Sequence, residues 1–427
     1  MNVKQLFQVS CLSLAISSTV SAGSLADIYQ QALTNDPQLK AAEASYNAGK
    51  EIELQYKAAL LPQIGLAANT TAYDTELKDF NNHGYTLSLT QPVFDAASWF
   101  NFKQGKVLSA QAALKFNLEQ QNLIQRTVKA YLGVLRAKSA LQTSEAQERA
   151  IKRRLDQVNA QFEVGLIANT DVQEAQASFD NAYVARIAAQ GELDNSYEAL
   201  ARLTGKTVVD TPELSDDYPI AEPVPAQAQP WLEKAWKDNL ALKLANLSSE
   251  ASRRSAQAAR AGHYPVLKLT ATYDHDNGTV LSNDSTNTSA IGLSLSVPIF
   301  SGGAISSQSR AAEQRLLESQ YNRENMLREV TQTTRSLLRN LRTGALSVQA
   351  LKQSIKSSET ALQATEEGYK VGTRNVVDVL KAEQQLYAAL RDYSNARFNY
   401  VQNLIIFKQQ LGTLSPQDIN ELDSWLK

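Results

Sequence analysis

Two stretches of this 427-residue chain share one layout, and the repetition limits the folds open to it. The first, FEVGLIANTDVQEAQ, covers Phe162–Gln176, and the second, EEGYKVGTRNVVDVL, covers Glu366–Leu380. In each stretch a Val-Gly pair precedes an Asp-Val pair, and the two copies stand 207 residues apart. A near-constant offset indicates a tandem duplication. Two pairs of prolines match at offsets of 203 and 206, namely Pro62 with Pro265 and Pro92 with Pro298.

The duplication divides the chain into two repeats with a linker between them. We expect the first repeat at 23–208 and the second at 230–414, each with the order helix, two strands, long helix, tight turn and helix. Residues 209–229 are rich in proline, which lacks a backbone donor and disrupts helices and central strands, so they should form a surface linker. Residues 415–427 follow as a C-terminal segment.

The first 22 residues have the pattern of a secretory signal peptide. Lys4 is followed by an apolar run and by Val20-Ser21-Ala22, after which cleavage is expected. Cys11, the only cysteine, lies in this run, so the mature chain would form neither a disulfide nor a thiolate metal site. Lipid attachment at Cys11 is disfavoured because Gln8 stands where an aliphatic residue is wanted. No later stretch has the ~18 consecutive apolar residues of a membrane-spanning helix.

The segment after each predicted hairpin has the pattern of a long helix. Between Ser301 and Glu367 there is no proline, and apolar residues recur at the three- and four-residue spacing of a coiled coil. A helix of about 65 residues reaches ~100 Å at a rise of 1.5 Å per residue. Leu25–Leu60 and Asp171–Leu203 are each about half as long, so we expect two shorter helices to stack end to end against one long helix.

Four segments alternate apolar and polar residues and predict two β-hairpins, at 62–95 and 265–300. Their tips are expected in the polar stretches Asp74–Gly84 and Asp274–Ser289. Strands of roughly ten residues have the length that a membrane barrel needs, but the pattern alone leaves a small soluble sheet equally open. Four strands have two open edges, which lipid does not tolerate, so a membrane location would require several chains in one barrel. Three chains would supply twelve strands.

The composition and motifs give no indication of catalysis or of a cofactor, and we expect no metal site. A formal charge of −2 does not favour nucleic acid as a partner. The histidines are His83, His263 and His275, the first and last in the predicted hairpin tips. Asp274-His275-Asp276 is interpreted as a solvated loop because no second ligand cluster accompanies it. The sequence Ser301-Gly302-Gly303 lacks the Lys-Ser/Thr of a phosphate loop and predicts a turn.

Specific motifs then point to a family. GYKVGTRNVVDVL at Gly368–Leu380 and LLPQIGL at Leu60–Leu66, with the duplication and the paired Val-Gly turns, closely resemble the TolC family of Gram-negative outer-membrane efflux and secretion ducts. The resemblance covers essentially the whole mature chain. It implies a mainly α protein with membrane β structure, a homotrimer whose twelve-stranded barrel lies in outer-membrane lipid and continues into a twelve-helix barrel across the periplasm.

The resemblance also implies a function and partners. The trimer would be open to the outside and pinched at its inner end, as the exit duct for multidrug efflux and type I protein secretion. A periplasmic adaptor protein and an inner-membrane RND or ABC pump would be its partners. The linker 209–229 and the segment 415–427 would lie in an equatorial region.

The paired turns gain a role from this resemblance. Glycine is expected to take the left-handed backbone position that ends each helix, and Thr170 or Asn375 can cap the helix that follows. Both turns then lie at one end of the assembly, which would be the periplasmic entrance where adaptor hairpins dock. The docking residues would be Val164, Gly165, Leu166, Val371, Gly372 and Thr373.

The same resemblance implies a gate at these turns. It places Tyr369 and Arg374 opposite Thr170 and Asp171, as links that hold the inner helices closed. Arg374 and Asp171 could form a charge-assisted pair, and the Tyr369 hydroxyl could donate to the same carboxylate. Exposed charges at a turn that contribute little are the alternative.

A constriction is implied one turn further along the helix. Asp378 and Lys381 are three residues apart, so they share a helix face and would each form a ring of three in a trimer. The family usually has acids at both positions. Lys381 departs from that pattern, so strong cation selectivity does not carry over to this chain. Two solvated surface charges without a role in the pore are the alternative.

Two classes of function remain at this stage. One is a passive export duct, and the other is a secreted or periplasmic coiled-coil adaptor that binds other proteins without forming a pore. One pair of alternating strands in each repeat favours the duct.

Overall fold

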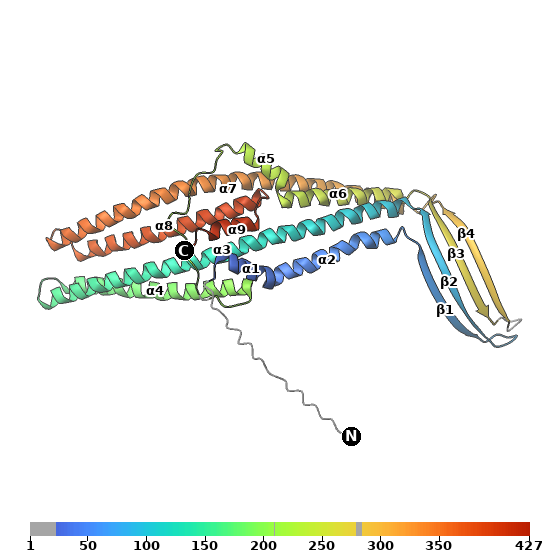
Figure 1. The fold of residues 1–427 in the computed structure, drawn as a ribbon, viewed down its shortest axis with the longest axis horizontal. Coiled ribbons are helices and arrows are strands. Elements are labelled where there is room, and N and C mark those ends of the chain that lie inside the picture. Colours follow the sequence, from blue (N-terminus) through green and yellow to red (C-terminus); the bar gives the residue numbers. More distant parts are fainter. Residues whose placement is uncertain (1–22, 209, 279–283) are drawn as a thin grey trace, which may run out of the picture.

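The long axis of the molecule is set by helices that run side by side for most of its length (Figure 1). A computed structural model describes residues 23–208, 210–278 and 284–427. The predicted signal peptide, residues 1–22, lies outside the described residues. The helix turns that carry the paired Val-Gly motifs lie at one end, and the strands lie at the other (Figure 1).

The two halves present the same kinds of element in the same order. The first half contains α1 (Leu25–Asn35), α2 (Pro37–Ala58), β1 (Gln63–Tyr73), β2 (Phe80–Phe94), α3 (Ala96–Glu163) and α4 (Asn169–Thr204). The second half contains α5 (Gln229–Asp238), α6 (Leu240–Ala261), β3 (Val266–Asn277), β4 (Ser285–Ser296), α7 (Ala304–Lys370) and α8 (Val376–Gln410). A short helix, α9 (Pro416–Asp423), follows.

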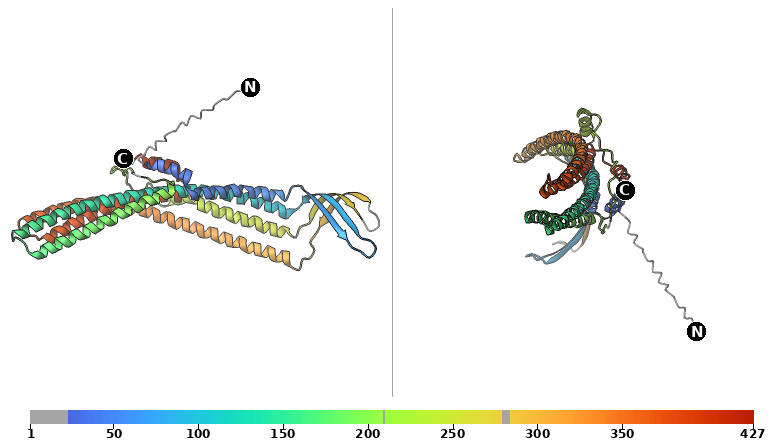
Figure 2. Two further views of the ribbon diagram at one scale, coloured as in Figure 1. Left: turned by 90° about the horizontal axis from the view of Figure 1, so that it is seen from below. Right: turned by 90° about the vertical axis from the view of Figure 1, so that its left-hand side faces the viewer.

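Each long helix supports two shorter ones. The 68-residue α3 packs against α2 over its first half and α4 over its second, and α7 packs in the same way against α6 and α8. The two groups join because α3 also contacts α6 and α8. Towards the turns the lateral order is α7, α8, α3, α4, and the helices curve around an open, concave side (Figure 2). Within the described residues, no helix combines the length and the apolar character needed to cross a membrane.

The segment predicted as one helix, Leu25–Leu60, is instead two helices that meet at Asp36. Pro37 is the first residue of α2, and the Asp36 carboxylate accepts a hydrogen bond from the Leu39 amide at 2.7 Å. A proline is favourable at the first helical position but disrupts a continuing helix, so an Asp-Pro pair starts a new helix. Apolar spacing alone could not reveal this break, because it continues on both sides of it.

The second repeat has a break at the equivalent place, between α5 and α6, without a proline. The buried Asn239 side chain accepts from the Leu242 amide at 2.9 Å and donates to the Gln410 carbonyl at 2.8 Å. One side chain thus caps α6 and satisfies a carbonyl at the end of α8. Both breaks allow the chain to change direction beside the long helices.

A belt around the middle of the molecule holds the apolar core. We call α1, α9, residues 210–220 and the adjoining part of α3 the equatorial belt, and Figure 2 shows α1 and α9 on the convex side of the helices. The backbone amides and carbonyls of Glu213 and Lys427 exchange two hydrogen bonds of 2.8 Å. The core includes the fully buried side chains of Leu25, Ile28, Leu123, Tyr131, Leu200 and Ile419.

Arg397 of α8 ties the linker to this belt. Its side chain is 7 % exposed, and it donates to the Asp216 carboxylate at 2.7 Å and to the Ser215 carbonyl at 2.5 Å. A guanidinium fork that binds a carboxylate and a carbonyl at once fixes the direction of the chain leaving the first repeat.

The four strands form a single antiparallel sheet in the order β1-β2-β3-β4. The two hairpins therefore join through β2 and β3, with a bulge between Pro92 and Phe94. Residues paired across strands share a face, and the alternation gives one face that is mostly apolar and one that is mostly polar and small. The apolar face carries Ile64, Leu66, Leu87, Leu89, Leu269, Ala271, Ile291, Leu293 and Leu295.

The hairpin tips are shorter than the sequence predicted. His83 and Asp274-His275-Asp276 belong to the paired strands β2 and β3 and not to loops. Thr86 donates to the Asp274 carboxylate at 2.6 Å, and His275 Nδ1 lies 2.6 Å from Asn287 Oδ1. Cross-strand partners satisfy these polar groups, so they prolong the ladder although their composition is typical of loops.

Candidate functional site at the helix turns

The α3–α4 and α7–α8 turns close in the same way. Gly165 and Gly372 have φ of 78° and 76°, the left-handed region that only glycine adopts at little cost. After each glycine a backbone amide reaches back across the last turn of the helix, from Leu166 to the Gln161 carbonyl and from Thr373 to the Gly368 carbonyl, both at 2.9 Å. This arrangement satisfies carbonyls that a helix end leaves free. The glycine positions predicted from the sequence are confirmed.

The helices after the two turns begin differently. Asn375 caps α8 in a capping box, since its side chain accepts from the Asp378 amide at 2.8 Å and the Asp378 carboxylate accepts in return from the Asn375 amide. The N-cap of α4 is Ala168, whose side chain has no cap hydrogen bond, and Thr170 lies inside the helix. The prediction that Thr170 caps α4 is therefore wrong, whereas the prediction for Asn375 is confirmed.

Apolar side chains project from both turns. Val164 is 70 % exposed, Leu166 is 74 % exposed and Val371 is 73 % exposed. Because each turn is closed by backbone hydrogen bonds, these side chains are not needed to hold it. Three large apolar side chains are therefore exposed at the turn end although the closure of the turns does not require them.

The expected gate residues find partners within the chain other than those predicted. Tyr369 donates to the Gln161 side chain at 2.5 Å and not to Asp171. Arg374, in the turn that precedes α8, lies 3.8 Å from the carboxylate of Asp378 in the first turn of α8, and no pair between Arg374 and Asp171 occurs in the described chain. The two residues are only four apart in the sequence, so this contact is local to the turn and the start of α8.

Asp171 nevertheless lies close enough to Tyr369 to affect it. Burial raises the pKa of the Tyr369 hydroxyl, Arg154 opposes that effect, and the Asp171 carboxylate adds to it. The hydroxyl therefore stays protonated and remains a hydrogen-bond donor.

A charged cluster just above the turns was not predicted from the sequence. Arg154 of α3 pairs with Glu366 of α7 and, at 3.2 Å, with Glu383 of α8, so one guanidinium joins three helices. The Glu383 side chain is 6 % exposed, and its Oε2 has no hydrogen-bond partner among the described residues. Burial raises the pKa of Glu383 even though Arg154 opposes the shift. Glu383 stands three residues after the apolar Leu380, on the same face of the helix. This spacing was the one sequence signal that Glu383 would be buried.

The two residues of the expected constriction have different environments. Asp378 is half-buried and takes part in the capping box of α8. Lys381 is exposed and makes no ion pair or hydrogen bond with any described residue. The single chain thus leaves the ammonium group free, and it offers no cluster of three or more metal-ligating side chains in its described part.

Comparisons with known proteins agree with this architecture. The sequence profile of the outer membrane efflux protein family matches residues 28–206 and 231–413, one match in each half. The outer membrane protein TolC of Vibrio cholerae is 35 % identical over 98 % of this chain and 97 % of its own length. The alkaline protease secretion protein AprF of Pseudomonas aeruginosa is 29 % identical, over 92 % of this chain and 85 % of its own. In fold, the outer membrane protein VceC of Vibrio cholerae superposes with a TM-score of 0.81 at 19 % identity, over 91 % of this chain and 96 % of its own.

We predict that Arg154→Gln destabilises the turn end of the molecule by about 3 kcal/mol at neutral pH, because it leaves Glu383 buried without a counter-charge. Hydrogen exchange of the α8 amides near Glu383 measures the effect. The neighbouring Arg153 is exposed and forms no ion pair with a described residue, and its charge has the smallest of the effects on Glu383, so Arg153→Gln is the control and should change exchange far less than Arg154→Gln.

The pH dependence of this variant has a defined sign. Because burial raises the pKa of folded Glu383, the loss in stability is present above that pKa and shrinks as the pH falls through it and the carboxyl takes up a proton. A deficit that is the same at about pH 7.5 and about pH 5 would show that Glu383 does not cause it.

Proposed function

The chain belongs to the outer membrane efflux protein family and resides in the outer membrane, and we propose that three copies form an exit duct gated at its periplasmic end. It serves efflux and the type I secretion of proteins. The relatives reported above are named as outer-membrane or secretion proteins, and none is named as an enzyme.

The observation that carries this proposal is the sheet. Strands β1 and β4 are its edges, and neither has a partner on its outer side in the described chain. The apolar face is solvent-exposed in the single chain, with Ile64 71 % exposed and Leu293 68 % exposed. Lipid accommodates an apolar face but not open edges, and the smallest usual membrane barrel has about eight strands. Three copies joined edge to edge give a closed barrel of twelve strands.

The helices support the same assembly. In the turn half of the molecule, the lateral order leaves α7 and α4 with neighbours on one side only (Figure 1). Three curved chains placed edge to edge give a twelve-helix barrel whose interior is the concave side seen in Figure 2. The equatorial belt then surrounds this barrel on the outside.

Partners follow from the ends of the duct. The exposed apolar side chains of the two turns form the docking surface for a periplasmic adaptor, which connects the duct to an inner-membrane RND or ABC pump. The secretion role named for AprF supports type I secretion as one use of the same exit. The β-barrel of the duct contacts outer-membrane lipid.

We predict that Leu293→Arg destabilises the trimer by about 2 to 4 kcal/mol, because an arginine near the bilayer midplane must leave water. Ser294→Arg, on the opposite face of β4, is the control and should be mild. Resistance of the trimer to heat in detergent measures both variants. Equal tolerance of the two arginines would place these strands outside the membrane.

We infer that the closed state depends on Tyr369 and Arg374 at the turns, where Tyr369 is held by Gln161 and Arg374 by Asp378 within the chain. Tyr369→Phe combined with Arg374→Ser removes the hydrogen bond to Gln161 and one turn charge, so the single-channel conductance in planar bilayers should rise. The unmodified trimer must itself conduct, which tests the duct directly. A soluble monomer without conductance would support the coiled-coil adaptor instead, and a folded trimer with unaltered conductance would exclude these links.

Threefold symmetry turns Asp378 and Lys381 into adjacent rings of opposite charge about 4.5 Å apart along the helix axis. Their fields largely cancel, so we predict weak cation selectivity and weak block by trivalent cations. Lys381→Asp should strengthen both, and Asp378→Asn should weaken cation preference further. Reversal potentials across a salt gradient measure the selectivity. Strong cation selectivity in the unmodified trimer would show that Asp378 and Lys381 do not set the field in the constriction.

A further inference from the structure

A groove of about 680 Å³ lies where α3 passes between α4 and α8. Its α3 residues include Lys129, Gly133 and Arg136, which lie on the helix face opposite Tyr131 and Leu135, two residues buried in the equatorial belt. Since the belt is on the convex side, the groove opens on the concave side (Figure 2). From Gly133 to the end of α3 is about 30 residues, so the groove lies ~45 Å from the turns.

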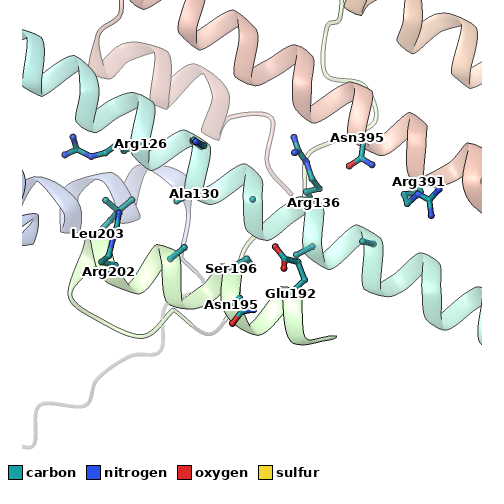
Figure 3. A pocket seen from close by; sticks show the side chains of 15 residues that line it. Arg126, Ala130, Arg136, Glu192, Asn195, Ser196, Arg202, Leu203, Arg391 and Asn395 are labelled. Carbon is teal, nitrogen blue, oxygen red and sulfur yellow. The ribbon is translucent and has the colours of Figure 1, made fainter. Parts of the chain in front are cut away.

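The groove has more positive than negative charge. Figure 3 shows Arg126 and Arg202 at one end and Arg136 and Arg391 toward the other. Arg126 is paired with Asp36 and Glu119, and Arg391 lies 3.7 Å from Asp392. The other three cations of the lining are Lys129, Arg136 and Arg202, and none of them pairs with a carboxylate in the described chain. Glu192 is the one acid among the lining residues.

The best placed of these cations is Arg136. Its Nη2 donates to Asn399 at 2.7 Å, but its Nε is buried and has no hydrogen-bond partner among the described residues. Burial also lowers the pKa of Arg136, although a guanidinium remains charged at neutral pH. A guanidinium without a carboxylate is a ready donor to a negatively charged group.

Small side chains create the space between the charges. Ala130, Gly133, Ala137 and Ala140 follow one another along α3 at the spacing of one helix face. A Cβ added at Gly133 would meet no atom within 4 Å, so the floor is open there. The groove therefore combines an apolar floor with cations at its sides and ends.

We propose that this basic groove binds organic anions in which one sulfonate or carboxylate is attached to an apolar ring system. The anionic group accepts hydrogen bonds from Arg136 and Arg202, and the ring covers the alanine floor. This inference rests on the proposed duct, because only there does the concave side line the path of exported molecules. Each trimer then carries three such sites midway along the passage.

The test uses 1-naphthalenesulfonate as the probe and single-channel current through the unmodified trimer as the readout. We expect a reversible, concentration-dependent block. The double variant Lys129→Gln/Arg202→Gln removes two exposed cations, and the half-blocking concentration should rise about tenfold or more. Because both side chains are exposed, folding should be preserved.

Two controls separate the site from a general effect of charge. Arg328→Gln/Arg335→Gln removes two exposed cations from α7, outside the groove, and should leave the block unchanged. 1-Naphthalenemethanol has the same ring without the charge and should block at least tenfold more weakly. If the trimer conducts but the probe does not block it, the groove proposal fails and the duct stands. The same holds if both double variants change the half-blocking concentration equally. A protein that does not conduct would overturn both.

Discussion

The burial of apolar side chains along α3 is the interaction on which the rest of the structure depends. A helix of 68 residues is far longer than one apolar core can support by itself, so its stability depends on neighbours along its whole length. Two shorter helices and the equatorial belt supply them, and α8 joins the second repeat to the same helix. The fully buried Tyr131, Leu132 and Val134 mark the place where these elements meet.

Much of this fold could be predicted from the sequence because its signals are local or repeated. The glycines of the turns, the helical spacing after Ser301 and the alternation around Leu293 each depend on a few neighbouring residues. The breaks at Asp36 and Asn239 were missed because apolar spacing persists through both. The Asp36-Pro37 pair is a local signal for the first break, whereas the second has no proline and depends on the contact of Asn239 with Gln410. Four strands with two open edges were expected, but the sequence did not say which strands join the two hairpins, because the pairing of β2 with β3 links residues of different repeats.

The candidate site was predictable to a smaller extent. Sequence placed the turns correctly, but it could not say which side chain Tyr369 would reach, because Gln161 is 208 residues away along the chain. The cluster around Arg154 has no motif at all. Its three members come from α3, α7 and α8, and their proximity exists only after the two repeats have packed.

The contact of Arg397 with the linker has a consequence for movement. Arg397 fixes one point of α8 to the equatorial belt, and Asp378 lies 19 residues nearer the turn, a distance of ~28 Å. The Arg154 cluster holds the same helix a second time, at Glu383, only five residues from Asp378. If the turn is to move sideways while Arg397 keeps its contacts with the belt, the ion pair between Arg154 and Glu383 has to open, so this pair sets the resistance of the turn to such a movement.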